Sequence, residues 1–147
     1  MNQELASSYR NVGFFELIGI ELVHSEEFHV IGILKIGSQH HNRAGNVHGG
    51  VLCSMIDFAA CAAGLHSEPG EPTRYGVTLS LTTQFTKAVS HGRLRVEGRV
   101  LSSGRKNYSA EAHIYDDAGD LVAHGIGSFQ WRPGSQPGTK SMTSTKE

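Results

Sequence analysis

The stretch 41–64, HNRAGNVHGGVLCSMIDFAACAAG, constrains the fold of this chain more than any other. Its second half, 51–64, is almost wholly apolar or small. Apolar side chains fall on every face of a helix with about 3.6 residues per turn. A helix that is apolar all round must be surrounded by protein. The sequence therefore predicts one central helix, ended by Gly64, around which the other elements are arranged.

One ionisable residue interrupts this helix, because Asp57 is the only such residue between His48 and His66. A carboxylate in apolar surroundings is costly unless it is paired or used in chemistry. Asp57 could be a structural carboxylate that caps a neighbouring element. Carboxylates in unusual surroundings gather at functional sites, which favours a functional role. In front of the helix, Gly49 and Gly50 let backbone N–H groups approach a ligand at the helix N-terminus.

The spacing of these residues predicts a site that needs two chains. Gly49 and Asp57 are eight residues apart, or about 12 Å along a helix. One small reacting group cannot meet both at that separation. Two antiparallel copies of the helix, related by a two-fold axis, would place Asp57 of one chain near Gly49 of the other. We therefore expect a homo-oligomer, with dimer and tetramer both left open.

Alternating apolar and polar residues predict strands on both sides of the helix. We expect a short helix at 3–16, and then two strands within 18–36 joined by a turn at 25–27. Four more strands are expected from 77 to 131, the first with Val77, Leu79 and Leu81 on one face. The pattern predicts an α+β fold, an antiparallel sheet of about five to six strands wrapped around one long central helix. The domain is expected to span 1–132, with a disordered tail at 133–147.

Composition excludes several functional classes. The chain has 147 residues and a net charge of −1 at pH 7, which gives no electrostatic reason to expect nucleic acid or an anionic membrane as partner. No apolar run is long enough to span a membrane, and the first residues lack the apolar segment of a secretory signal. Cys53 and Cys61 are too far apart on the helix to pair, and are read as small buried core residues of a protein in the reducing cytoplasm.

Nine histidines raise the question of a metal site. His40, His41 and His48 lie close together in the sequence. Their spacing matches neither the HExxH pattern nor that of a zinc finger, so no metal is expected.

The pattern Asn42-x5-His48-Gly49-Gly50-x6-Asp57 resembles the signature of hotdog-fold acyl-CoA thioesterases of the phenylacetate-degradation type. The resemblance extends from about Phe14 to Trp131. It implies the hotdog fold, the arrangement already predicted from the strand pattern. It also implies hydrolysis of an acyl-CoA to a free acid and CoA. No cofactor is expected, because CoA is part of the substrate.

The resemblance assigns a role to each residue of this pattern. Asp57 would be either the general base that activates water or the nucleophile that attacks the thioester. The Gly49 N–H would polarise the thioester carbonyl, with Gly50 beside it at the substrate. Asn42 would orient substrate or water, unless it only makes a local turn. His48 would hold the loop or contact the thioester.

Further substrate contacts are expected from the strands that follow the helix. Thr78 matches a small hydroxyl position that would hold the water or the thioester, although an ordinary strand threonine is the alternative. Ser80 is assigned to the substrate. The turn Ser103-Gly104-Arg105 resembles the turn that contacts CoA in the family, with solvated charge as the alternative reading of the arginine. Additional cations that could meet CoA phosphates are Arg43, Arg74 and Lys87.

The function has two alternatives on the same fold. A non-catalytic acyl-CoA-binding or sensing protein would keep the binding residues without hydrolysis. A dehydratase or hydratase would use His-centred motifs, which this sequence lacks. The acyl group stays open among aromatic, medium-chain and short-chain esters.

Overall fold

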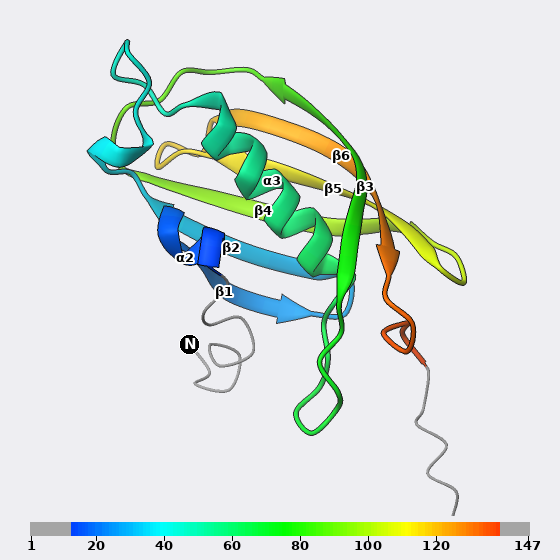
Figure 1. The fold of residues 1–147 in the computed structure, drawn as a ribbon. Coiled ribbons are helices and arrows are strands. Elements are labelled where there is room, and N and C mark those ends of the chain that lie inside the picture. Colours follow the sequence, from blue (N-terminus) through cyan, green and yellow to red (C-terminus); the bar gives the residue numbers. More distant parts are fainter. Residues whose placement is uncertain (1–12, 139–147) are drawn as a thin grey trace, which may run out of the picture.

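The computed structural model describes residues 13–138, which form one antiparallel sheet around a central helix (Figure 1). The elements are α2 (Gly13–Ile18), β1 (Ile20–Glu26), β2 (His29–Lys35), the 3-10 turn η1 (Ser38–His40), α3 (Gly49–Ala63), β3 (Gly76–Phe85), β4 (Arg93–Ser103), β5 (Asn107–Tyr115) and β6 (Leu121–Trp131). The strand order is β1-β2-β4-β5-β6-β3, with every pair antiparallel. The predicted α+β architecture, with six strands, is confirmed.

Helix α3 is buried as its apolar sequence requires. More than half of its side chains are buried: Leu52, Met55, Ile56, Phe58, Ala59, Ala60, Ala62 and Ala63. They pack against the inward-facing residues of the sheet, among them Val30, Leu94, Val96 and Ile114. Gly64 caps the C-terminal end, and its carbonyl accepts a hydrogen bond of 2.8 Å from the Trp131 indole. Figure 1 shows the sheet curving around this helix.

The close approach of α3 to β4 depends on Gly98. A Cβ atom at this position would overlap the carbonyl oxygen of Ala59, which belongs to helix backbone and cannot turn aside. We expect Gly98→Ala to lower the free energy of unfolding by about 1–3 kcal/mol, the usual cost of overpacking. Thermal unfolding measures this. Gly13→Ala is the control, because nothing lies within 4 Å of its added methyl group. Equal stability of the two variants would contradict the close approach.

The expected alternation in β3 fails at Leu79. The pairing of β3 with β6 shifts between Thr78 and Ser80, so Leu79 occupies a bulge. Its side chain is 54% exposed, whereas Val77 and Leu81 are half-buried. A bulge inserts one residue without a partner and changes the direction of the side chains around it. Sequence alternation alone cannot distinguish this arrangement from a regular strand.

The β1–β2 turn lies two residues later than predicted. Glu26 pairs with His29, so the turn consists of Glu27 and Phe28, and Phe28 has φ 65°. Ser25, expected in the turn, is a buried strand residue. Strand β1 also has an irregularity, between Leu22 and His24, after which Ser25 faces inward and pairs with Val30.

The ends of the described region also refine the predictions. Helix α2 overlaps the helix expected at 3–16 over residues 13–16 and ends two residues later, at Ile18, whereas residues 3–12 lie outside the described part. Beyond residue 132, the chain still packs on the domain: Ser135 is buried, and its hydroxyl accepts a hydrogen bond of 3.0 Å from the Tyr75 N–H. The rest of the tail expected to be disordered, 139–147, lies outside the described residues.

None of the described helices has the length and hydropathy needed to cross a membrane. Cys53 and Cys61 are unpaired and half-buried rather than fully buried.

Candidate active site

A cavity of about 290 Å³ lies along the C-terminal half of α3. The loop after the helix and the beginning of β3 form its other walls, together with Phe15 of α2 and Ser25 of β1. Apolar atoms make up most of the lining surface, with contributions from Phe15, Phe58 and Leu65. Asp57 and Thr78 supply polar groups on the wall. A mainly apolar cavity with a few polar groups is the usual form of a small-molecule site.

Asp57 and Thr78 are brought together at this cavity. The Thr78 hydroxyl donates a hydrogen bond of 2.6 Å to the Asp57 carboxylate. This length is typical of a hydroxyl that donates to a charged oxygen. Thr78 therefore orients the carboxylate, a role beyond that of an ordinary strand threonine. Asp57 is half-exposed, so water and substrate can reach it from the cavity.

Only one of the two glycine amides at the start of α3 is open to a ligand. His48 caps the helix, and its Nδ1 accepts a hydrogen bond of 2.8 Å from the Gly50 N–H. The Gly50 amide, expected at the substrate, is thus already used. Among the described residues, no acceptor is found for the Gly49 N–H. A polarising amide at this helix end would be that of Gly49.

The loop before α3 is held by its own side chains. The Asn42 side-chain oxygen accepts hydrogen bonds from the N–H groups of Ala44 (3.0 Å) and Asn46 (3.1 Å). This is the local-turn alternative foreseen for Asn42, and it leaves only the amide NH2 for a substrate. His40 is buried, where its Nδ1 accepts from the Gly37 N–H and its Nε2 donates to the Ile18 carbonyl at 2.6 Å. These contacts fix the approach of the chain to the helix N-terminus.

The remaining predicted residues lie away from the cavity within one chain. Ser80 is exposed on the edge strand β3. The turn Ser103-Gly104-Arg105 joins β4 to β5, and the Gly104 N–H donates to the Asn107 carbonyl at 2.8 Å. Figure 1 shows this hairpin beyond the C-terminal end of α3, opposite the end that carries Gly49. Arg105 is exposed.

Arg74 and Lys87, two further candidates to contact a CoA phosphate, differ in the contacts they already make. Arg74 lines the cavity and donates to Glu71 at 3.4 Å. Lys87 contacts Asp116 at 2.5 Å and Asp120 at 2.7 Å, and both hydrogen bonds raise the pKa of its ammonium group. Lys87 is therefore engaged with two carboxylates and is a poor candidate for a phosphate.

Sequence reasoning missed a polar contact in the cavity wall. Ser25 and His66 are joined by a hydrogen bond of 2.8 Å between Oγ and Nδ1, and His66 Nε2 lies 3.0 Å from Glu68. Ser25 and His66 both line the cavity. No local signal could have found this pair, because the two residues are 41 positions apart and belong to different elements.

Cys61 supplies a thiol to the lining. Burial raises the pKa of the Cys61 thiol to about 11. The group is therefore a thiol at neutral pH, and the thiol is a much weaker nucleophile than the thiolate. The Cys61 thiol is therefore a weak candidate for the nucleophile of this site.

Comparisons with known proteins agree with this geometry. A family model described as the Thioesterase superfamily matches residues 44–123, more than half of the chain. A conserved protein of Pseudomonas aeruginosa has 31% identical residues and a TM-score of 0.75, over 82% of this chain and 94% of that one. Thioesterase Superfamily Member 2 of zebra fish is 26% identical with a TM-score of 0.73, over 87% and 93% of the two chains.

A variant of the phenylacetic acid degradation protein PaaI from Thermus thermophilus shares the fold. The TM-score is 0.70 at 20% identity, and the match covers 80% of this chain and 96% of that one. The matched family segment contains both Gly49 and Asp57. The sheet wrapped around α3 is the hotdog fold, and the chain belongs to the Thioesterase superfamily.

Proposed function

We propose that this protein hydrolyses an acyl-CoA thioester to a free acid and CoA. The observation that carries the proposal is the Asp57 carboxylate, held by Thr78 at the wall of a mainly apolar cavity. The cavity would take the acyl group and bring its carbonyl carbon to Asp57. A volume of about 290 Å³ favours a compact acyl group over a long chain. The unpaired cysteines support a reducing compartment, the cytoplasm, for the reaction.

Asp57 would act in one of two ways. As a general base it removes a proton from a water molecule, whose oxygen then attacks the thioester carbon. As a nucleophile it attacks that carbon directly and forms a mixed anhydride, which water hydrolyses. In both routes the C–S bond breaks, a C–O bond from water forms, and CoA leaves as the thiolate. Negative charge develops on the carbonyl oxygen, so a fixed N–H donor beside it lowers the barrier.

That donor is assigned to Gly49 of a second chain. Within residues 13–138, strand β3 lies at one edge of the sheet and pairs with β6 alone. Its Thr78 end contacts Asp57, and its Phe85 end lies against Gly49, where a Cβ would meet the ring at 3.4 Å. Two β3 edges paired antiparallel, about an axis midway between Thr78 and Phe85, place Asp57 of each chain near Gly49 of the other.

The edge strand supports such pairing. Leu79 and Phe85 are 54% and 55% exposed, which is unusual for large apolar residues on an open sheet edge. Unpaired strand edges with apolar side chains favour association with another strand. We therefore propose a homo-oligomer built on a β3-paired dimer. The site is complete in this dimer, so it does not require two dimers to join into a tetramer.

A thiol-release assay tests the proposed activity. The full chain is mixed with a panel of short-chain, medium-chain and aromatic CoA esters, and free CoA thiol is measured. Release that depends on Asp57 supports a thioesterase. An acyl-CoA-binding protein would bind the same esters without releasing thiol. A dehydratase or hydratase would change the acyl group and also release none, so either result would overturn the proposal.

Arg105 is expected to contact a CoA phosphate from its exposed turn. Arg105→Ala should raise KM for CoA esters by about 3- to 10-fold with little change in kcat, because a phosphate contact is equal in the ground and transition states. A short thioester without the nucleotide should be unaffected. Arg93→Ala is the control, since Arg93 is an exposed arginine at the other end of β4. A loss on both substrate types would count against the assignment.

A further inference from the structure

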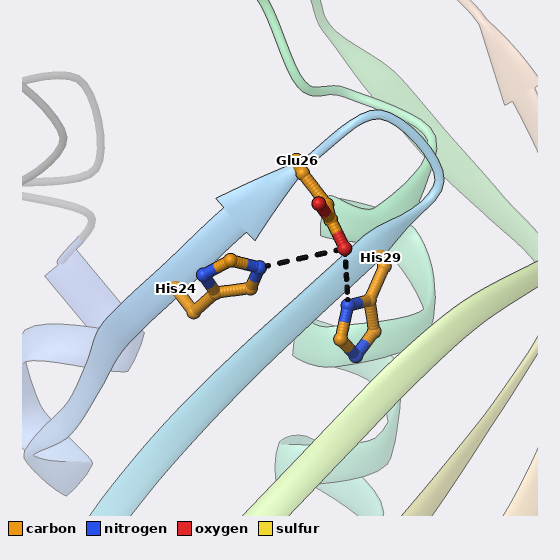
Figure 2. Close-up of side chains that lie close together, drawn as sticks. All are labelled: His24, Glu26 and His29. Carbon is orange, nitrogen blue, oxygen red and sulfur yellow. Dashed lines mark hydrogen bonds and ion pairs between the residues drawn. The ribbon is translucent and has the colours of Figure 1, made fainter.

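A group of three potential metal ligands lies at the β1–β2 hairpin, away from the proposed active site. His24 and Glu26 come from the end of β1, and His29 begins β2 (Figure 2). One nitrogen of each imidazole and one carboxylate oxygen all lie within 4.8 Å of one another. Within residues 13–138 this is the only group of three or more histidine, cysteine or acidic side chains that meets this criterion.

The distances are close to those that a metal ion requires. Glu26 Oε1 lies 2.9 Å from His29 Nδ1 and 3.6 Å from His24 Nε2. Zinc binds imidazole nitrogen and carboxylate oxygen at about 2.0–2.2 Å, so two ligand atoms at a tetrahedral angle stand roughly 3.3 Å apart. The observed distances lie on either side of this value. Figure 2 shows both imidazoles directed at the same carboxylate, so small side-chain rotations would admit an ion between them.

His29 is also held from its other side, as metal-binding histidines usually are. Its Nε2 lies 2.8 Å from Glu97 Oε1 on β4, and its side chain is only 14% exposed. The same carboxylate accepts a hydrogen bond of 2.6 Å from Arg99. In the tautomer whose Nε2–H donates to Glu97, His29 Nδ1 carries a lone pair that can bind an ion.

Glu26 is suited to supply the negative ligand. Its Oε1 is the atom that both imidazole nitrogens approach, at 2.9 Å for His29 Nδ1 and 3.6 Å for His24 Nε2. Two imidazoles and one carboxylate form a donor set found in zinc sites with an open coordination position. Such nitrogen-containing sets discriminate against Mg²⁺ and Ca²⁺, which prefer oxygen ligands only.

The group lies on the outer face of the sheet. Glu26 pairs with His29 and His24 with Ile31, so these residues share one face. Val30 and Leu34 face the core on the other side of β2. Ser25, between the two β1 ligands in sequence, points inward to the cavity. An ion at the hairpin would therefore not touch the substrate, but it would fix the segment of edge strand that forms part of the cavity wall.

We propose that His24, Glu26 and His29 bind one Zn²⁺ ion per chain at the β1–β2 hairpin, with water in the remaining coordination position. The ion bridges β1 and β2 across their turn and is a structural ion. This site is absent from the sequence-based expectation, which found no metal-binding spacing. It does not depend on the proposed thioesterase activity, because none of its ligands belongs to the active site.

Zinc binding by the untagged full chain tests the proposal. Isothermal titration with ZnCl2 should give one site per chain, and MgCl2 should give none. His24→Gln and Glu26→Gln should each weaken zinc binding by more than about tenfold, since even the loss of an outer partner costs about 10- to 100-fold. Zinc should raise the melting temperature of the wild type and of the control, but not of the two variants. The control is His91→Gln, an exposed histidine whose hydrogen bond is to the adjacent Ser90.

The outcomes separate clearly. One zinc site that is lost in both ligand variants and kept in His91→Gln establishes the hairpin site. No zinc binding, or binding that the His24 and Glu26 variants leave unchanged, overturns it. Equal binding of Mg²⁺ would also overturn it, because that result indicates a surface of oxygen ligands. Circular dichroism of each variant verifies the fold, and the exposed position of His24 makes His24→Gln the variant least able to disturb it.

Discussion

Asp57→Asn is expected to lower kcat for acyl-CoA hydrolysis by about 100-fold or more. A positioned general base contributes about 10²- to 10⁴-fold, and an amide can neither remove the proton from water nor attack the thioester. The substitution keeps the volume of the side chain. It also keeps an oxygen that can accept the hydrogen bond now formed at 2.6 Å by Thr78. The loss should therefore be chemical and not structural.

Three measurements isolate this effect. The melting temperature of Asp57→Asn should be close to that of the wild type, and binding of a non-hydrolysable CoA thioether should survive. Glu21→Gln makes the same chemical change at an exposed carboxylate of β1 and should retain full kcat. Full activity in Asp57→Asn would remove Asp57 from the mechanism. Loss of CoA-analogue binding together with activity would instead indicate that the residue shapes the site.

Two inactive variants refolded together in equal amounts should recover about a quarter of the wild-type activity, and the purified mixed dimers about half. Asp57→Asn removes the base or nucleophile, and Gly49→Val places a branched side chain at the amide assigned to the carbonyl oxygen. In a two-fold dimer, each site takes Asp57 from one chain and Gly49 from the other. A mixed dimer therefore has one site with both lesions and one intact site. Random pairing makes half of the dimers mixed, and each of these has one of its two sites intact.

Distinct affinity tags on the two variants allow the mixed dimers to be purified after refolding together. Each variant alone should be inactive as a homodimer. Gly49→Val should fold, because its Cβ stands at an ordinary contact distance of 3.4 Å from the nearest group, the Phe85 ring. If purified mixed dimers show no activity, the two-chain site is wrong. The donor to the carbonyl oxygen must then be found within one chain.

The sequence by itself determined the central helix and the sheet around it. A segment that is apolar on every face, as 51–64 is, can be stable only inside protein, and alternation along 93–131 sets the direction of the strand faces. These signals are local, so they do not depend on the rest of the fold. The isolation of Asp57 and its distance from Gly49 are also local facts, and they sufficed to predict a reactive carboxylate and a site made by two chains.

Only the tertiary structure decided which groups meet. Thr78 reaches Asp57 from 21 residues away, and Ser25 reaches His66 from 41. At the helix N-terminus, the sequence could not tell which glycine amide His48 would occupy. Such contacts depend on how the helix lies across the sheet and on the direction of each side chain, which no local pattern fixes.

The β1–β2 hairpin shows the physical reason most directly. Its turn lies two residues later than the sequence predicts, and this register places Glu26 opposite His29. With the predicted turn at 25–27, Glu26 would lie in the loop and the two histidines would not share one carboxylate. Side chains on a strand alternate every residue, so a small shift in register decides which groups face each other. Register is set by packing across the whole sheet, and for this reason the proposed zinc site is visible only in the folded chain.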